Sequence, residues 1–425
     1  MANLKGGTII DGGLIEKSGT GTASQVAGAA GAPAVFESAA TSSGTDSRVS
    51  IVSAGVGTCV IVYEDEGNSG YGTAVVATVN GSVDVTTSIT YGTPVIFESA
   101  EIEAPSVTTI YDSAASAWRI IIVYRDKGNS NYGTSRVGTV SGTTRTFGSA
   151  QVFGAWDTDS PKASGAGTGK VAISYTAVAN TTCSVIVGTL SGTTMTYGFP
   201  ATFGPAAGHG NTNDITTVPN GNTLVISYRD LSNSNHLTAI AGTVSGTTVT
   251  LGSPVVFYAT NTTNTPAIAN WSYPYNKFVV AWKNSSEGGT AIAGTLSGTT
   301  ISFGTAVDFS ASAIEGDLAA VWDDDGSVGD GTTEGVIIVY GSGDVDLLRA
   351  TPVRITGTNT MNIGTTVNGP TCGPAKLSVT YDGHNEKIIS AYSDTANGNY
   401  GTAVAWRALP GGNITVDLST GNYFE

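Results

Sequence analysis

Four sets of polar residues recur along the chain, and each combines an Asp and an Asn with a Tyr or His. Carboxylate and amide groups can bind sugar hydroxyls, and a Tyr ring can stack on the face of a sugar. The pattern therefore favours carbohydrate binding. The sets are Asp65, Asn68 and Tyr71; Arg125, Asp126, Asn129 and Tyr132; Arg229, Asp230, Asn233 and His236; and Asp394, Asn397 and Tyr400.

The same residue types also build polar turns, because Asp, Asn, Ser and Gly hydrogen-bond readily to the local backbone. Three equivalent places in the chain lack the pattern, which indicates either one specialised cleft or ordinary sequence drift. Both interpretations stay open. The departing segments are Tyr175-Thr176-Ala177, Trp282-Lys283-Asn284 and Tyr340-Gly341-Ser342.

An acidic loop at 323–330 offers oxygen ligands of the kind that calcium prefers, from Asp323, Asp325 and Asp330. Its spacing differs from the twelve-residue calcium loop, and no Glu stands at the last position. The alternative is a solvated turn between two strands. Calcium is the one cofactor that the sequence suggests.

Signatures of catalysis are missing from the sequence. His209, His236 and His384 are far apart and lack zinc spacing. No Gly-x-Ser-x-Gly elbow or phosphate-binding loop occurs, and the 33 acidic residues do not single out a glycosidase pair. We therefore expect a protein that is not an enzyme.

The elements that position these residues follow from a repeat marked by one buried-type aromatic in each unit. The markers of units 1 to 7 are Tyr63, Tyr124, Tyr175, Tyr228, Trp282, Tyr340 and Tyr392, at steps of 61, 51, 53, 54, 58 and 52 residues. Each closes a run of apolar, mostly β-branched residues. This period, with only strand-like segments inside it, predicts an all-β, seven-bladed β-propeller with four antiparallel strands per blade.

Glycine turns give an independent count of the units, because a two-residue hairpin loop needs positive φ. The turns are Ser141-Gly142, Ser191-Gly192, Ser245-Gly246 and Ser297-Gly298, with variants at Asn80-Gly81, Thr356-Gly357 and Gly411-Gly412. After each of the first five turns in chain order, an apolar run ends in Phe; these residues are Phe97, Phe153, Phe203, Phe257 and Phe309.

In unit 2 the alternation predicts strands near 105–111, 118–125, 132–140 and 143–153. The polar sets then lie between the second and third strands, on the face that carries the connections between blades. The segment 33–38 resembles 94–99, so we expect it to pair beside Ile414–Leu418 in the last blade and close the ring. This divides the chain into a Gly/Ser/Thr-rich segment, 1–32, and a propeller, 33–425.

The composition of the chain limits the classes of partner that it could bind. A net charge of -15 and no run of Lys or Arg argue against nucleic acid. Three widely spaced cysteines, Cys59, Cys183 and Cys372, indicate no disulfide framework. The N-terminus lacks the apolar core of a secretory signal and no later segment is apolar enough to insert in a membrane, so we expect synthesis in a cytoplasm and no classical secretion.

Two motifs carry a family resemblance. The opening Leu4-Lys5-Gly6-Gly7-Thr8 resembles short segments of tail-fibre proteins, and the unit from Tyr124 through Thr144 resembles repeats in virion proteins of cyanophages and other marine tailed bacteriophages. The resemblance implies a virion location, attachment through the N-terminal segment and a homo-oligomer, with trimers common among fibre proteins. The attachment residues would be Leu4, Lys5, Ile9, Ile10, Leu14 and Ile15.

The main expectation is a tail-fibre or adhesin component whose propeller binds a host surface receptor, an envelope polysaccharide. One alternative is a capsid-decorating or tail scaffold without a ligand. Another is a free lectin or glycan-processing propeller.

Overall fold

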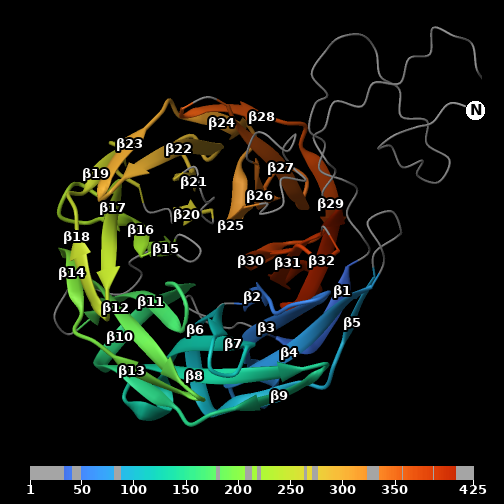
Figure 1. The fold of residues 1–425 in the computed structure, drawn as a ribbon. Helices are drawn as coiled ribbons and strands as arrows, with labels where there is room; N and C mark the ends of the chain where they lie inside the picture. The colour runs from blue at the N-terminus through green and yellow to red at the C-terminus, as the bar shows by residue number, and fades with distance from the viewer. Residues whose placement is uncertain are drawn as a thin grey trace, which may run out of the picture.

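The chain forms an all-β fold whose antiparallel sheets are arranged in a ring, as seen in the computed structural model (Figure 1). The structure describes residues 33–40, 49–80, 88–178, 182–205, 213–217, 222–262, 266–269, 276–322, 335–356, 358–385 and 387–407. Three-residue 3₁₀ turns in these ranges include η1 (Glu66–Asn68), η2 (Lys127–Asn129) and η4 (Thr395–Asn397). Within the described ranges, no helix is long and apolar enough to cross a membrane.

The described strands make one thirteen-stranded sheet, three five-stranded sheets and one four-stranded sheet. The largest contains β2 (Val49–Ser53), β3 (Thr58–Asp65), β4 (Tyr71–Asn80), β5 (Ser88–Tyr91), β6 (Val95–Asp112), β7 (Ala117–Asp126), β8 (Tyr132–Ser141), β9 (Thr144–Phe147), β10 (Gln151–Gly165), β11 (Lys170–Ala177), β12 (Thr182–Ser191), β13 (Thr194–Tyr197) and β14 (Ala201–Pro205).

The other four sheets follow in chain order. The five-stranded sheets contain β15 (Asn213–Thr217), β16 (Thr223–Asp230), β17 (His236–Ser245), β18 (Thr248–Leu251) and β19 (Val255–Tyr258); β20 (Ala267–Ile268), β21 (Lys277–Lys283), β22 (Gly289–Ser297), β23 (Thr300–Phe303) and β24 (Val307–Ser310); and β25 (Ile314–Trp322), β26 (Gly335–Ser342), β27 (Leu347–Thr356), β28 (Thr360–Ile363) and β29 (Val367–Thr371). The four-stranded sheet contains β1 (Ala34–Ala40), β30 (Pro374–Asp382), β31 (Lys387–Asp394) and β32 (Tyr400–Arg407).

The large sheet joins three units because β6 and β10 each belong to two of them. The first part of β6 pairs with β4, and the second part pairs with β7. The register shifts between Glu103 and Ser106, where Ala104 has φ 48°. The strand predicted at 105–111 is therefore the second half of a longer one.

The predicted strand at 143–153 is wrong, because two strands cover that stretch. β9 pairs with the C-terminal end of β8, and β10 pairs with its N-terminal end. Gly148, Ser149 and Ala150 separate the two. The predicted strands at 118–125 and 132–140 coincide with β7 and β8 to within a residue.

The aromatic markers and the phenylalanines pack together and form the core between units. All seven markers are buried on the second strand of their unit. In the six Phe–marker pairs, from Phe36 with Tyr63 to Phe309 with Tyr340, the ring centroids lie 5.1–5.5 Å apart. A side chain on Gly133 would come within 2.5 Å of the Phe153 ring, which explains glycine in the Tyr-Gly-Thr motif.

The N-terminal strand β1 lies in the sheet of the C-terminal strands and pairs with β32 (Figure 1). Its register repeats that of β6 on β4, including both shifts. The Tyr63 hydroxyl donates to Glu37 over 3.3 Å, as the Tyr124 hydroxyl donates to Glu98 over 2.9 Å. β1 thus packs on unit 1 as an outer strand packs on the following unit. Its predicted neighbour, 414–418, lies outside the described residues.

The inner strands of the seven units contact one another in a cycle. β2 contacts β6, and the series continues through β10, β15, β20, β25 and β30 back to β2. At the junction of the two chain ends, Ile51 N donates to Ser378 Oγ over 3.2 Å and Ser53 N donates to Thr380 Oγ1 over 2.9 Å. These bonds satisfy backbone donors on an inner strand edge.

Candidate functional site

The predicted polar sets lie on hairpins between the second and third strands. In each set the Asp is the cross-strand partner of the ring-bearing residue that opens the next strand. The pairs are Asp65 with Tyr71, Asp126 with Tyr132, Asp230 with His236 and Asp394 with Tyr400. The first two hairpins lie at the level where β6 passes between units, because Glu101 pairs with Tyr71 and Ile102 pairs with Asp126.

The carboxylates in these sets face the turn that follows them. Asp394 Oδ1 accepts from Ala396 N over 3.2 Å, and Asp230 Oδ1 accepts from Ser232 N over 3.0 Å. The Asp65 and Asp126 carboxylates make no such capping hydrogen bond, but the backbone N–H groups of their turns act to lower the pKa of each. Turn construction therefore accounts for the repeated Asp.

The amide and aromatic members of the sets are more accessible than the carboxylates. Asn129, Asn233 and Asn397 are exposed, and Asn68 is half-buried. The rings of Tyr71, Tyr132, His236 and Tyr400 are also half-buried. The structure thus brings each Asn and its ring-bearing partner together on one hairpin, whereas the four sets stay in separate units.

Arg125 is the centre of an ion-pair network and is buried. Its guanidinium binds Asp157, with Nη2 2.8 Å from Oδ1, and also binds Glu103. Lys127 Nζ lies 2.6 Å from a Glu101 oxygen and 3.0 Å from a Glu103 oxygen. Burial acts to lower the pKa of Arg125, but Glu103 and Asp157 outweigh it and the pKa is raised. The network ties the end of β7 and its turn to β6 and β10, the two strands that pass between units.

Two carboxyls of the sets have raised pKa values. Burial is the main cause at Asp65, and Glu37 adds to it. Burial also raises the pKa of Asp126, with Glu98 as the second cause. At Arg229 burial lowers the pKa of the guanidinium. These shifts reflect burial at the base of the hairpins rather than a cluster of charges around a ligand.

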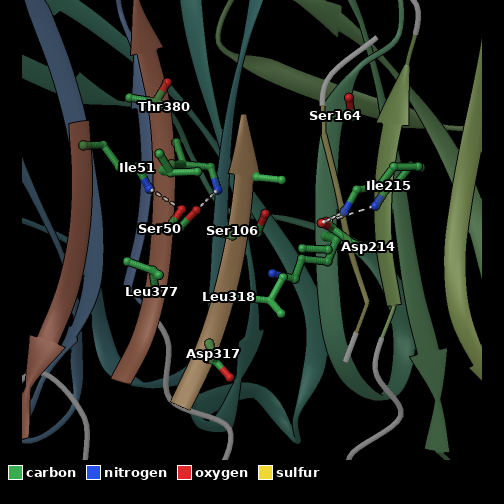
Figure 2. A pocket seen from close by; sticks show the side chains of 18 of the residues that line it. Ser50, Ile51, Ser106, Ser164, Asp214, Ile215, Asp317, Leu318, Leu377 and Thr380 are labelled. Atoms are coloured by element: carbon green, nitrogen blue, oxygen red, sulfur yellow. Dashed lines mark hydrogen bonds between the residues drawn. The ribbon is translucent and has the colours of Figure 1, made fainter. Parts of the chain in front are cut away.

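A cavity of about 370 Å³ lies at the centre of the ring and is lined by all seven inner strands. Figure 2 shows Ser50, Ser106 and Asp214 on three of these strands around it. Lys162 and Asp317 also line the cavity. Its walls are mainly strand edges, so the cavity offers polar groups at many points.

Side chains in the cavity are used to join neighbouring strands. Ser50 Oγ accepts from Val107 N over 3.1 Å, and Ser106 Oγ accepts from Ala163 N over 3.2 Å. Asp214 Oδ2 accepts from Ile268 N over 3.0 Å. Because each acceptor binds the backbone of the next unit, these groups hold the ring together. Sequence reasoning missed them, although the 56-residue spacing of Ser50 and Ser106 was a usable signal.

Metal and thiol chemistry find little support in the described part of the chain. No group of three or more His, Cys, Asp or Glu residues there could hold a metal ion. The three cysteines are buried and are not joined in disulfides, and burial raises the pKa of Cys372 to about 11. Asp323, Asp325 and Asp330 lie outside the described residues, as do Leu4, Lys5, Ile9, Ile10, Leu14 and Ile15.

No protein-family model and no curated protein matches the chain. Among solved structures, it is similar to AofleA from Arthrobotrys oligospora, with 10% identity over 79% of this chain and 91% of that chain and a TM-score of 0.49. It is also similar to the six-bladed fucose-binding lectin of Aleuria aurantia, with 16% identity over 76% and 96% and a TM-score of 0.48.

An enzyme is among the similar structures as well. The Trypanosoma rangeli sialidase has 11% identity over 74% of this chain and 56% of that chain, with a TM-score of 0.43. At these identities and scores, the similarities transfer no residue role and no ligand to this chain.

Proposed function

We propose that the chain is a non-enzymatic, seven-bladed β-propeller protein of a bacteriophage virion that binds a glycan on the host surface. The binding proposal rests on the face of the ring that carries the hairpins between second and third strands, here called the hairpin face. Four units there present an Asn amide beside a Tyr or His ring. Amides bind sugar hydroxyls and rings bind sugar faces. Four similar weak sites on one molecule would gain strength by avidity.

The blade count is supported by three features. The inner strands contact one another in a cycle, the Phe–marker pairs repeat between units, and β1 occupies the outer position of the last sheet. Closing a ring in this way protects strand edges from pairing with other molecules. The location on a virion is supported by the resemblance of residues 4–8 and of the unit 2 repeat to tail-fibre proteins.

Glycan binding by the hairpin face is tested with soluble full-length protein. We expect it to bind host cells and to delay adsorption of the phage. The variant Asn129→Ala, Asn233→Ala, Asn397→Ala should lose much of this effect while keeping its thermal midpoint, because the three side chains are exposed. Wild-type protein that neither binds cells nor delays adsorption would sink the receptor proposal.

The virion location is tested by immunogold labelling of intact particles with antibody to the full chain. Label at tail tips or fibres supports an adhesin, and label over the head supports a decorating protein. Protein found only free in the lysate would overturn the virion location and leave a free lectin.

A further inference from the structure

The hairpin between β6 and β7 in unit 2 extends further than the equivalent hairpins of units 1 and 3. In units 1 and 3 the last bonds between the first two strands are from Ala54 N to Thr58 O and from Ala166 N to Lys170 O, each 2.9 Å long. The matching pair in unit 2 is Ile110 and Arg119, but its ladder continues. At about 3.4 Å per residue, the extra pairs add about 7 Å to the hairpin. They are Tyr111 with Trp118 and Asp112 with Ala117.

This extension carries two exposed aromatic side chains. Trp118 is 55% exposed and Tyr111 is 39% exposed. They face each other across the strands, with ring centroids 5.5 Å apart and planes at 68°. Their hairpin is at the opposite end of β7 from Asp126, so the two rings lie on the face opposite the polar sets.

Neither the repeat pattern nor the packing of the core requires an indole at position 118. The same position relative to the aromatic marker holds a turn residue in four other units: Gly57, Gly169, Asn222 and Asn276. Turn residues there suit a hairpin that ends early. An indole that is more than half exposed also contributes little to packing between units. Trp118 is therefore unexplained by the fold.

The hairpin that carries the two rings is fixed in place. Arg119 Nε donates to Asp112 Oδ2 over 3.0 Å, and Asp112 Oδ1 accepts from Ala114 N over 3.1 Å. At the base, Gly169 N donates to the Tyr111 carbonyl over 3.0 Å. Because these bonds lie within the protein, they hold the rings in position, which lowers the entropic cost of binding.

We propose that Trp118 and Tyr111 form a stacking platform for a neutral hexopyranose residue of a glycan. The platform is a second binding site, on the face opposite the Asn hairpins, and it rests on the proposed function in that the ligand is again carbohydrate. The indole face binds the C–H face of the sugar, since the negative ring quadrupole attracts polarised hydrogens. Tyr111 forms the side wall of the site.

Size and charge favour a sugar over other partners. A stable protein interface needs about 800 Å² on each partner, far more than two aromatic rings provide. A pyranose ring, by contrast, matches the indole in size. The net charge of -15 disfavours nucleic acid and acidic sugars, and the carboxylate of Asp112 beside the rings is paired with Arg119.

The test is surface plasmon resonance of full-length protein on immobilised neutral polysaccharides: dextran, mannan and galactan. We expect Trp118→Ala to weaken binding to the best of these by about tenfold, as loss of a stacking contact does, and Tyr111→Ala to weaken it less. Phe199→Ala is the matched control, because Phe199 is 92% exposed on a different turn. Its affinity should stay within about twofold of the wild type, and all variants should keep the wild-type thermal midpoint.

The outcomes separate this site from the hairpin face. If the triple Asn variant loses binding and Trp118→Ala does not, the platform is overturned and the proposed function stands. If the wild type binds none of the three polysaccharides, the platform is overturned, whereas binding to host cells still tests the proposed function. A concentration-dependent dimer that Trp118→Ala dissolves would show a contact between chains and overturn the platform as well.

Discussion

The two faces of the ring differ in how closely their hairpins repeat from one unit to the next. On the face of the polar sets, units 1, 2 and 7 build nearly the same hairpin, with a 3₁₀ turn of three residues after the Asp. On the opposite face the hairpins between first and second strands differ in length, and that of unit 2 carries Trp118 outward. The hairpins of these three units are thus regular, whereas the hairpins compared on the opposite face differ.

This difference changes how repeated residues are interpreted. A residue that recurs in similar hairpins can be required by the hairpin itself, as the bonds from the turn backbones to Asp394 and Asp230 show. Trp118, which occurs in one unit where four others have Gly or Asn, is not required in this way. On the regular face the Asn side chains are candidates for binding because they are exposed, whereas the Asp side chains are already used.

The largest effect on stability should come from Arg125→Ala on the regular face. Removing the guanidinium takes away the ion pair of Asp157 and leaves Glu103 with Lys127 alone, and we expect a loss of about 2 kcal/mol, less than for a fully buried pair because Asp157 is partly exposed. The matched change Arg119→Ala on the opposite face should cost less, because it breaks one ion pair instead of two and loosens only a hairpin at the end of β7. Urea unfolding of both variants measures the difference, and equal losses would contradict the distinction between the faces.

A smaller effect is expected from Asp126→Ala. It removes a carboxylate that lies beside two backbone N–H groups of the turn without a capping hydrogen bond, and we expect a loss of about 1 kcal/mol. Asn129→Ala in the same turn should stay within about 0.5 kcal/mol, because that side chain is exposed. Carbohydrate binding should show the reverse order once the protein is folded. If Asp126→Ala kept full stability and lost binding, the carboxylate would be a ligand group instead of a part of the turn.

Much of the architecture was readable from the sequence because it depends on periodic, buried residues. The aromatic markers and the phenylalanines predicted the units, and both sets meet in the core between neighbouring units. The continuity of β6 across two units was not predicted, because an unbroken strand and two strands joined at a bulge have the same alternation. The split at Gly148 was missed because one partner, β8, serves both halves.

The candidate sites were less predictable than the units. Sequence located the four polar hairpins correctly, but only coordinates reveal that Asp394 binds its own turn while Asn397 is exposed. The serines of the central cavity act across units, so no local pattern around Ser50 or Ser106 announces them. Trp118 was not predicted, because a repeat pattern identifies only residues that recur, and this Trp occurs in one unit.

The smallest effect, and the sharpest contrast between the faces, concerns pH. Burial and Glu37 raise the pKa of Asp65 above 3.8, so its ionised form costs stability at neutral pH and the cost disappears as the pH falls through the raised pKa and below 3.8. Asp65→Asn keeps an oxygen acceptor and should therefore be slightly more stable than the wild type at pH 7 and equal to it below the ordinary pKa.

On the opposite face, the hydrogen bond from Arg119 lowers the pKa of Asp112. Its stabilising contribution is present above the ordinary pKa and lost as the pH falls through the lowered one, so Asp112→Asn should be slightly less stable than the wild type at pH 7. Thermal midpoints of the three proteins from pH 3 to pH 7 measure both trends, and shifts of the same sign at pH 7 would show that the two carboxylates do not play opposite electrostatic roles.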